Sequence, residues 1–86
     1  YTCMEKHIEI SRYLSVDGVT TYYVIEKKKN SSGIIWHGTS KQAAYQVAYR
    51  NAKKDNAPLY AIQYQSEIDE NGAKFIIPVG NEKLTN

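Results

Sequence analysis

The alternation of apolar and polar residues divides the chain into short strands and one helix. Residues 5–14 place Ile8 and Ile10 in one phase of a period-two pattern, which predicts a strand with one buried face. Residues 19–28 carry β-branched and aromatic side chains in both phases and predict a second strand. The Asp17-Gly18 pair between the two runs is a turn signal, so we expect the two strands to form a hairpin.

A single helix is predicted over residues 40–55. Thr39 or Ser40 can cap its first turn, and Pro58 prevents it from continuing toward the next run. Small residues recur every fourth position on one face, which lets a helix pack closely on a sheet. These residues are Ala44, Ala48 and Ala52.

Three further short runs predict strands at residues 34–37, 59–65 and 73–79. The order is β-β-β-α-β-β, and the expected fold is α+β: an antiparallel sheet of four to five strands with one helix packed on one face. The whole chain forms one domain, with mobile ends at residues 1–4 and 80–86. A helix about 10 Å across cannot cover five strands that span roughly 19 Å, so apolar surface should remain uncovered.

The predicted helix opens with the pair Ser40-Lys41, carries alanines four apart and ends in Ala52-Lys53-Lys54, and Leu59 begins the strand after it. In these features the chain resembles the bacterial family catalogued as domain of unknown function 2188. The resemblance covers residues 20–77 and implies a short β-β-α-β-β fold, but no activity or site. The first predicted strand and the long acidic hairpin at residues 66–72 depart from the family pattern.

Composition narrows the classes of function. The chain has 86 residues, a formal net charge of +2 and one cysteine, so an internal disulfide framework and a multi-cysteine metal site are excluded. No apolar run approaches the roughly 20 residues that a membrane span needs, and we expect a cytoplasmic protein without a membrane partner. Abundant Lys, Asn, Tyr and Ile with few Arg indicate an AT-rich bacterial or phage genome.

Catalytic chemistry finds little support in the sequence. Cys3, His7 and His37 are the classical nucleophile or base candidates, and no third group orients them. The acidic group before Asn71-Gly72 is interpreted as a solvated hairpin tip. It consists of Glu67, Asp69 and Glu70. We therefore predict no catalytic residue, no metal site and no cofactor.

The tyrosines carry the leading hypothesis, because Tyr is enriched at protein interfaces. Eight tyrosines exceed what one helix-covered core should hide. We expect a non-catalytic interaction module, a small bacterial or phage regulator or inhibitor that binds a protein partner or a second copy of itself. It would use a Tyr-rich sheet face or an edge strand, although core filling is an open alternative. The residues of this hypothesis are Tyr22, Val24, Tyr60 and Tyr64.

Nucleic-acid binding is the alternative function. Three consecutive lysines follow the second strand and more cations lie in the last turns of the helix, where they could contact phosphates. The same cations can instead guard a strand edge and complement the helix dipole. The residues of this alternative are Lys27, Lys28, Lys29, Arg50, Lys53 and Lys54.

Overall fold

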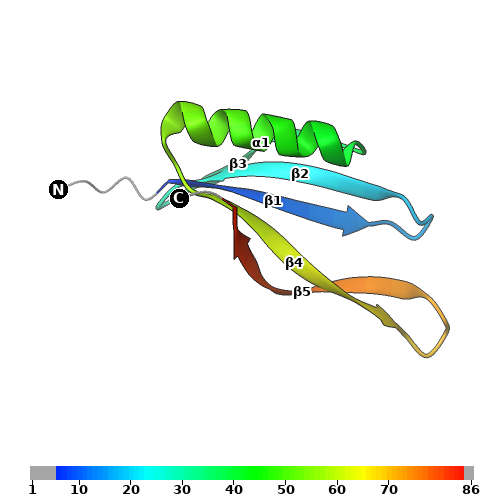
Figure 1. The fold of residues 1–86 in the computed structure, drawn as a ribbon. Helices are drawn as coiled ribbons and strands as arrows, with labels where there is room; N and C mark the ends of the chain where they lie inside the picture. The colour runs from blue at the N-terminus through cyan, green and yellow to red at the C-terminus, as the bar shows by residue number, and fades with distance from the viewer. Residues whose placement is uncertain (1–5, 85–86) are drawn as a thin grey trace.

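A computed structural model describes residues 6–84 as a five-stranded sheet with one helix on one of its faces (Figure 1). The predicted element order and the α+β class are confirmed. The sheet order is β3-β2-β1-β4-β5. The elements are β1 (His7–Leu14), β2 (Thr20–Lys27), β3 (Ser32–Gly38), α1 (Lys41–Asp55), β4 (Leu59–Ile68) and β5 (Lys74–Lys83).

The prediction of an antiparallel sheet is wrong at one pair of strands. β1 and β4 run parallel, with Ile8 opposite Leu59 and Ile10 opposite Ala61. The reason is topological: α1 carries the chain back along the sheet after β3, so β4 starts at the same end as β1 and runs in the same direction. The two hairpin turns follow the prediction, because Gly18 and Gly72 take the positive φ angles, +84° and +83°, that glycine readily adopts.

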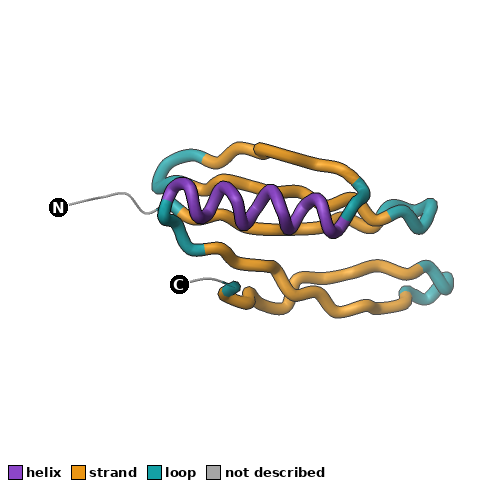
Figure 2. Tube along the Cα trace, turned by 45° about the horizontal axis from the view of Figure 1, so that its top comes forward, coloured by secondary structure: helices purple, strands orange, loops and turns teal. Residues whose placement is uncertain are grey.

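The core lies between α1 and the first four strands. Ile8, Val24 and Leu59 are fully buried, and the alanine stripe of the helix packs on them. Ala44 and Ala48 have no exposed surface, so the small side chains bring the helix axis close to the sheet, as their spacing predicts. Figure 2 shows that α1 extends over only part of the sheet and leaves the β4–β5 hairpin beyond its edge.

Both helix ends are capped within the chain. The hydroxyl of Ser40 accepts a hydrogen bond from the backbone N–H of Ala43 at 3.1 Å, so Ser40 rather than Thr39 is the N-cap. Asn56 adopts the left-handed conformation, and its N–H bonds to the carbonyls of Ala52 and Lys53.

The last strand is longer than the sequence predicts. Residues 80–83 belong to β5, and Leu84 packs against the core. The N–H of Leu84 donates to the carbonyl of Leu59 at 2.7 Å. The sequence ends the last strand at residue 79 and predicts a mobile end at residues 80–86, whereas the structure continues β5 to Lys83 and places Leu84 beside Leu59. The predicted mobile residues 1–4, which include Cys3, lie outside the described residues.

The β4–β5 hairpin diverges from the rest of the sheet. The parallel pairing of β1 and β4 ends at Ile10 and Ala61, after three residue pairs. Beyond this point β4 and β5 continue as a pair of their own and point away from β1 (Figure 1). The radius of gyration, 14.3 Å, exceeds the roughly 12 Å expected for a compact chain of this length. The projecting hairpin contributes to this extended shape (Figure 1).

Candidate functional site

The four residues of the predicted protein-binding face do not form one surface. Val24 is fully buried beneath α1, so its assignment to a binding surface is wrong. Tyr22 lies on the same side of β2 and packs against the core. Tyr60 lies on the opposite face of the sheet, with its ring edge-on to His7 at 5.3 Å. Period-two alternation separates two faces of a strand, but it does not show which face the helix covers.

The structure instead brings Tyr22 and Tyr64 together where β1 and β4 separate. We name the space between β1 beyond Ile10 and β4 beyond Ala61 the inner gap. Its closed end is the last β1–β4 pair, and its open end lies between the tips of the two hairpins (Figure 1). Residues from both hairpins line it.

Arg12 and Tyr64 bridge the inner gap. The backbone N–H of Arg12 donates to the phenolic oxygen of Tyr64 at 3.2 Å. The guanidinium carbon of Arg12 lies 5.2 Å from the centre of the same ring, within cation–π distance. A tyrosine side chain therefore lies across the gap in the place where the neighbouring strand would continue.

A cavity of about 240 Å³ lies at the closed end of the inner gap. We name it the tyrosine cavity. Lys41, the first residue of α1, contributes an ammonium group 5.9 Å from the ring centre of Tyr45. Glu82 also lines the cavity, but its Oε1 accepts a hydrogen bond from Gln63 Nε2 at 2.8 Å. The aromatic and cationic residues that line the cavity are Arg12, Tyr22, Lys41, Tyr45 and Tyr64.

The charges of the tyrosine cavity favour an anion. Neither Arg12 nor Lys41 forms an ion pair with any carboxylate in the described range, and both contact tyrosine rings instead. Burial raises the pKa of Tyr45, and the neighbouring Tyr22 and Tyr49 raise it further, whereas Arg12 opposes the shift. Tyr45 therefore stays protonated at neutral pH and keeps a hydroxyl that can donate a hydrogen bond.

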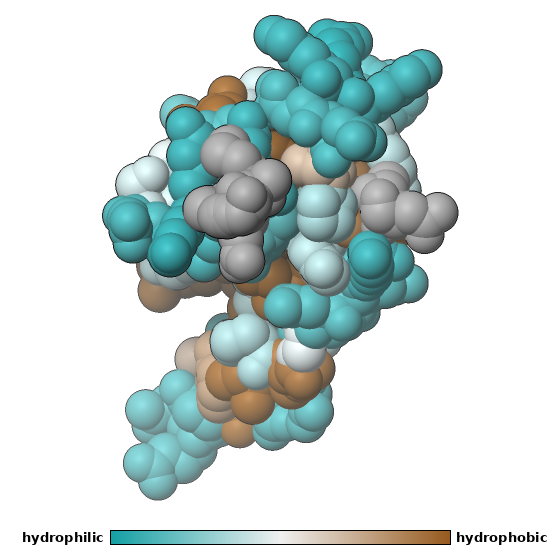
Figure 3. All heavy atoms as spheres, turned by 90° about the vertical axis from the view of Figure 1, so that its left-hand side faces the viewer, coloured by the Kyte–Doolittle hydropathy of each residue, from teal (hydrophilic) through white to brown (hydrophobic). Residues whose placement is uncertain are grey.

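The inner gap widens toward the hairpin tips. Two further hollows, of about 500 and 420 Å³, lie along the gap and share lining residues with each other, and Arg12 lines both of them as well as the tyrosine cavity. Leu14 and Val16 form one wall, while Ile76 of β5 forms the other. Figure 3 shows apolar side chains gathered on the lobe of the β4–β5 hairpin, next to the waist that joins it to the rest of the molecule. The gap is therefore charged at its closed end and more apolar at its open end.

Backbone hydrogen-bonding groups face the inner gap from both sides. N–H and C=O groups alternate in direction along a strand. The N–H of Ile8 donates across to Pro58, so the even-numbered residues Arg12 and Leu14 of β1 also point toward β4. Leu59 and Asp69 bond to the β5 side, so the alternate residues of β4 point toward β1. These are Tyr64, Ser66 and Ile68.

The inner edges lack the protection that the outer edges have. On β5, Pro78 has no N–H to offer, and Val79 is an extra residue opposite the Gln63/Tyr64 step. On β3, Ile35 is the extra residue of a similar bulge. Both devices discourage pairing with another chain. The ladders of β1 and β4 contain no such irregularity on the sides that face the inner gap.

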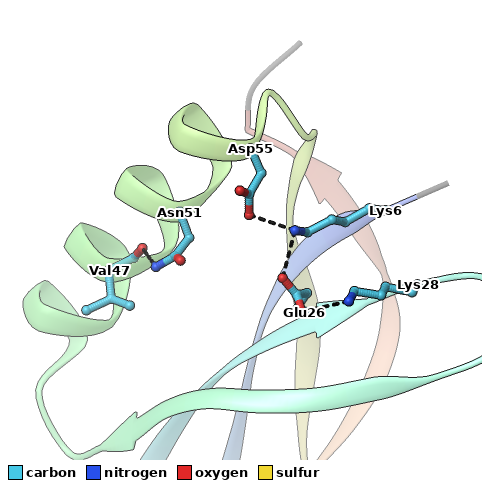
Figure 4. A network of polar contacts seen from close by, with 6 residues as sticks. All are labelled: Lys6, Glu26, Lys28, Val47, Asn51 and Asp55. Carbon is cyan, nitrogen blue, oxygen red and sulfur yellow. Dashed lines mark hydrogen bonds and ion pairs between the residues drawn. The ribbon is translucent and has the colours of Figure 1, made fainter. Parts of the chain in front are cut away.

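The predicted nucleic-acid residues gather at one end of the molecule. Lys6 joins Asp55 of α1 at 2.8 Å and Glu26 of β2 at 2.9 Å, and Lys28 lies 3.8 Å from Glu26 (Figure 4). The hydrogen bond from Lys6 lowers the pKa of Asp55. Lys27 lies 3.6 Å from Glu9. The remaining cations of this prediction have no ion pair within residues 6–84, namely Lys29, Arg50, Lys53 and Lys54.

The two histidines and the acidic turn do not line the tyrosine cavity. His7 Nε2 lies 3.0 Å from Glu9, and His37 lies beside Tyr23, so the two histidines make separate contacts. Asp69 accepts hydrogen bonds from backbone N–H groups of its own turn, which supports its interpretation as part of a hairpin tip. Within residues 6–84, no three side chains of His, Cys, Asp or Glu are grouped as a metal site would require.

No protein-family model, curated protein or solved structure matches the chain. The resemblance noted in the sequence therefore stays a prediction, and the candidate site rests on its own geometry. None of the helices in the described part of the chain has the length and apolar character needed to cross a membrane.

Three residues of the candidate site were missed in the sequence: Arg12, Lys41 and Tyr45. Arg12 carried a usable signal, because it stands in the otherwise apolar phase of β1 between Ile10 and Leu14. A cation in that phase indicates that the core ends there. Lys41 and Tyr45 carried none, since a lysine and a tyrosine near a helix start are common on solvated surfaces.

Proposed function

We propose that this chain is a non-catalytic protein-binding module that accepts an extended segment of another protein as an added strand in the inner gap. The observation that carries the proposal is a pair of regular strand edges that face each other there and have no strand partner among residues 6–84, with the Arg12 N–H bonded to the Tyr64 hydroxyl instead. Of the two binding modes expected from the sequence, a sheet face or an edge strand, this geometry favours the edge.

Strand addition uses main-chain hydrogen bonds for affinity and side-chain pockets for specificity. An added strand would meet Leu14 on one side and Ser66 on the other, where backbone groups point into the gap. Strands in a sheet lie about 4.8 Å apart, so β1 and β4 must be separated by about twice that distance to admit one. The side chain of Tyr64 already lies across the gap, which supports a separation of this order. Leu14, Val16 and Ile76 would contact the apolar side chains of the partner.

A peptide selection tests the proposal. Random peptides of roughly ten residues, the upper length of an ordinary strand, are displayed in two libraries, one with free C-termini and one with free N-termini. The peptides that bind best are synthesised, and their affinities and the backbone amide exchange of the protein are measured. We expect bound peptide to slow amide exchange at Leu14 and Ser66.

A matched pair of proline variants locates the binding edge. Ser66→Pro removes an N–H that points into the inner gap, and we expect it to weaken peptide binding about tenfold or more. Asn81→Pro removes an exposed N–H on the outer edge of the same hairpin and should leave the affinity unchanged. Circular dichroism establishes that both variants fold. The proposal is overturned if neither library yields a binder, or if the two prolines have equal effects on the folded proteins.

Nucleic-acid binding is a second candidate. It is supported by the proximity of the β2–β3 turn to the end of α1, since Lys28 from the turn and Lys54 from the helix both lower the pKa of Asp55. The interleaved carboxylates of Glu26 and Asp55 weigh against it. Binding of mixed-sequence DNA and RNA is measured at low salt, where phosphate contacts are strongest. Binding that Lys29→Gln weakens supports this candidate, and no binding at low salt rejects it.

A further inference from the structure

We infer that the strand accepted by the inner gap is the C-terminal end of its partner, and that its free carboxylate binds in the tyrosine cavity between Arg12 and Lys41. This inference rests on the proposed function, because it names the part of the partner that the gap receives. It follows from the shape of the gap, the direction of the two strands and the charges at the closed end.

The gap is closed at one end. β1 and β4 are paired directly from Ile8 to Ile10, so no third strand can lie between them there. A segment that enters from the open end between the hairpin tips must therefore stop, or turn out of the sheet, at the level of Arg12. A chain terminus meets this requirement without a turn. The tyrosine cavity lies at the position where that terminus would arrive.

The charges at the closed end determine which terminus it is. Arg12 and Lys41 are cations without an ion pair in the described part of the chain, and both line the cavity. A terminal carboxylate is attracted there, whereas a terminal ammonium group is repelled. Glu82 is the carboxylate among the cavity side chains and accepts a hydrogen bond from Gln63, so the lining carries two cations against one carboxylate and keeps a net positive charge. The guanidinium group of an arginine can donate two parallel hydrogen bonds to the two oxygens of one carboxylate.

The strand direction agrees with this assignment. β1 and β4 both run from the closed end toward the open end. A partner segment with its C-terminus at the closed end is antiparallel to both neighbours. Antiparallel pairing is slightly more stable per residue than parallel pairing. The cation pair and the ladder geometry therefore favour the same orientation.

The volume of the cavity limits what accompanies the carboxylate. About 240 Å³ is less than the roughly 300 Å³ at which drug-sized ligand sites begin, so the cavity holds little beyond one terminal residue. The rings of Tyr22 and Tyr45 form its walls and favour an apolar or aromatic terminal side chain. The hydroxyl of Tyr45, which keeps its proton, is a further donor for the carboxylate.

Chemical variation of one peptide tests the inference. The best peptide from the free C-terminus library is synthesised as the free acid, as the C-terminal amide, and with a Gly-Gly extension. We expect the amide and the extended peptide to bind about tenfold more weakly than the free acid or worse. An unaffected extended peptide would mean that an internal Asp or Glu side chain is bound, which overturns the inference.

Three variants connect the effect to the cavity. Arg12→Gln and Lys41→Gln should each reduce the difference between acid and amide. Lys74→Gln changes a cation that lines the wider part of the gap and should preserve the difference. Lys41 is exposed at the start of α1, so Lys41→Gln should fold normally. Lys41→Gln therefore tests whether the cavity binds the peptide carboxylate even if Arg12→Gln disturbs the fold.

The results separate this inference from the proposed function. If acid and amide bind equally while Ser66→Pro still weakens both, the carboxylate assignment is wrong and strand addition stands. If binders come only from the library with free N-termini, the orientation is reversed and the inference is wrong. If neither library yields a binder, the proposed function itself fails.

Discussion

The backbone N–H of Arg12 and the phenolic oxygen of Tyr64 form a hydrogen bond across 52 positions of sequence, between two hairpins that are otherwise diverging. The bond occupies a main-chain donor that would belong to the next strand of the sheet. Tyr64 thus takes the place of a strand at this point. A peptide that pairs with β1 must therefore displace the Tyr64 hydroxyl from the backbone N–H of Arg12.

Replacing Tyr64 by Phe should therefore separate the two roles of this side chain. The ring can still contact the Arg12 guanidinium, but the hydroxyl is lost. We expect the free energy of unfolding to fall by about 0.5–1.5 kcal/mol, the usual contribution of one hydrogen bond, and the Arg12 amide to exchange faster with solvent. Tyr49→Phe is the control, because Tyr49 is exposed on α1. Unchanged exchange at Arg12 would contradict this account of the bond.

The affinity for peptide should change in the opposite direction. Tyr64→Phe removes the group that competes for the Arg12 N–H, so the variant should bind the selected peptide at least as tightly as the original chain. Isothermal titration measures both proteins under identical conditions. Weaker binding by the variant would show that the hydroxyl contacts the peptide rather than competing with it.

The alanine stripe of α1 should tolerate no larger side chain. Ala48 has no exposed surface and belongs to the core cluster that α1 forms with β1, β2 and β4. Ala48→Leu must push the helix away from the sheet, which typically costs about 1–3 kcal/mol. Gln46→Leu places the same side chain on the exposed side of the helix and serves as the control. Equal unfolding midpoints in urea for the two variants would be inconsistent with the close packing.

Local sequence patterns predict the strands and the helix of this fold, but they do not predict the candidate site. Alternating Ile8 and Ile10 predict a strand because the residues of one phase must share an environment. The alanine spacing and Ser40 predict the helix for equally local reasons. The parallel pairing of β1 with β4 depends on where the chain returns after α1, and no residue in either strand specifies it.

The inner gap arises from the point at which that pairing ends. Ala61 and Ile10 are paired, but Tyr64 is too far from β1 to continue the ladder, and a bulge at Val79 bends the hairpin. The sequence predicts Tyr22 and Tyr64 as binding residues because Tyr is enriched at interfaces, but it does not predict that both line one cavity where β1 and β4 separate. A bulge depends on the pairing register of two strands, so the alternation within one strand does not reveal it.

The ion pairs around Lys6 should make stability depend on pH in a predictable direction. The hydrogen bond from Lys6 lowers the pKa of Asp55 in the folded protein. Asp55 therefore contributes to the free energy of unfolding above the ordinary carboxyl pKa of about 3.9, and this stabilisation is lost as pH falls through the lowered pKa of the folded state. The pKa of Lys6 is raised, so its own contribution persists at neutral pH and is lost at strongly alkaline pH.

Asp55→Asn tests this pH dependence. We expect the variant to unfold at a lower temperature than the original chain at neutral pH, and the difference to disappear in acid. Added salt should also reduce the difference, because the pair is near the surface. Lys53→Gln is the control, because Lys53 is an exposed cation of the same helix turn that has no ion pair in the described range and does not contribute to the pKa shift of Asp55. A difference that persists unchanged in acid would show that Asp55 acts through packing rather than charge.

Leu84 should stabilise the fold although it lies only two residues from the end of the given sequence. Its side chain packs against the core, and its N–H donates to Leu59, itself fully buried. Leu84→Ala should cost about 1–2 kcal/mol, below the range for a fully buried leucine because Leu84 is half-buried. Lys83→Ala, an exposed neighbour, should change stability by less than about 0.5 kcal/mol. Equal urea midpoints for the two variants would support the sequence prediction that residues 80–84 are mobile. Slow exchange of the Leu84 amide in the unmodified chain would support an ordered C-terminal segment.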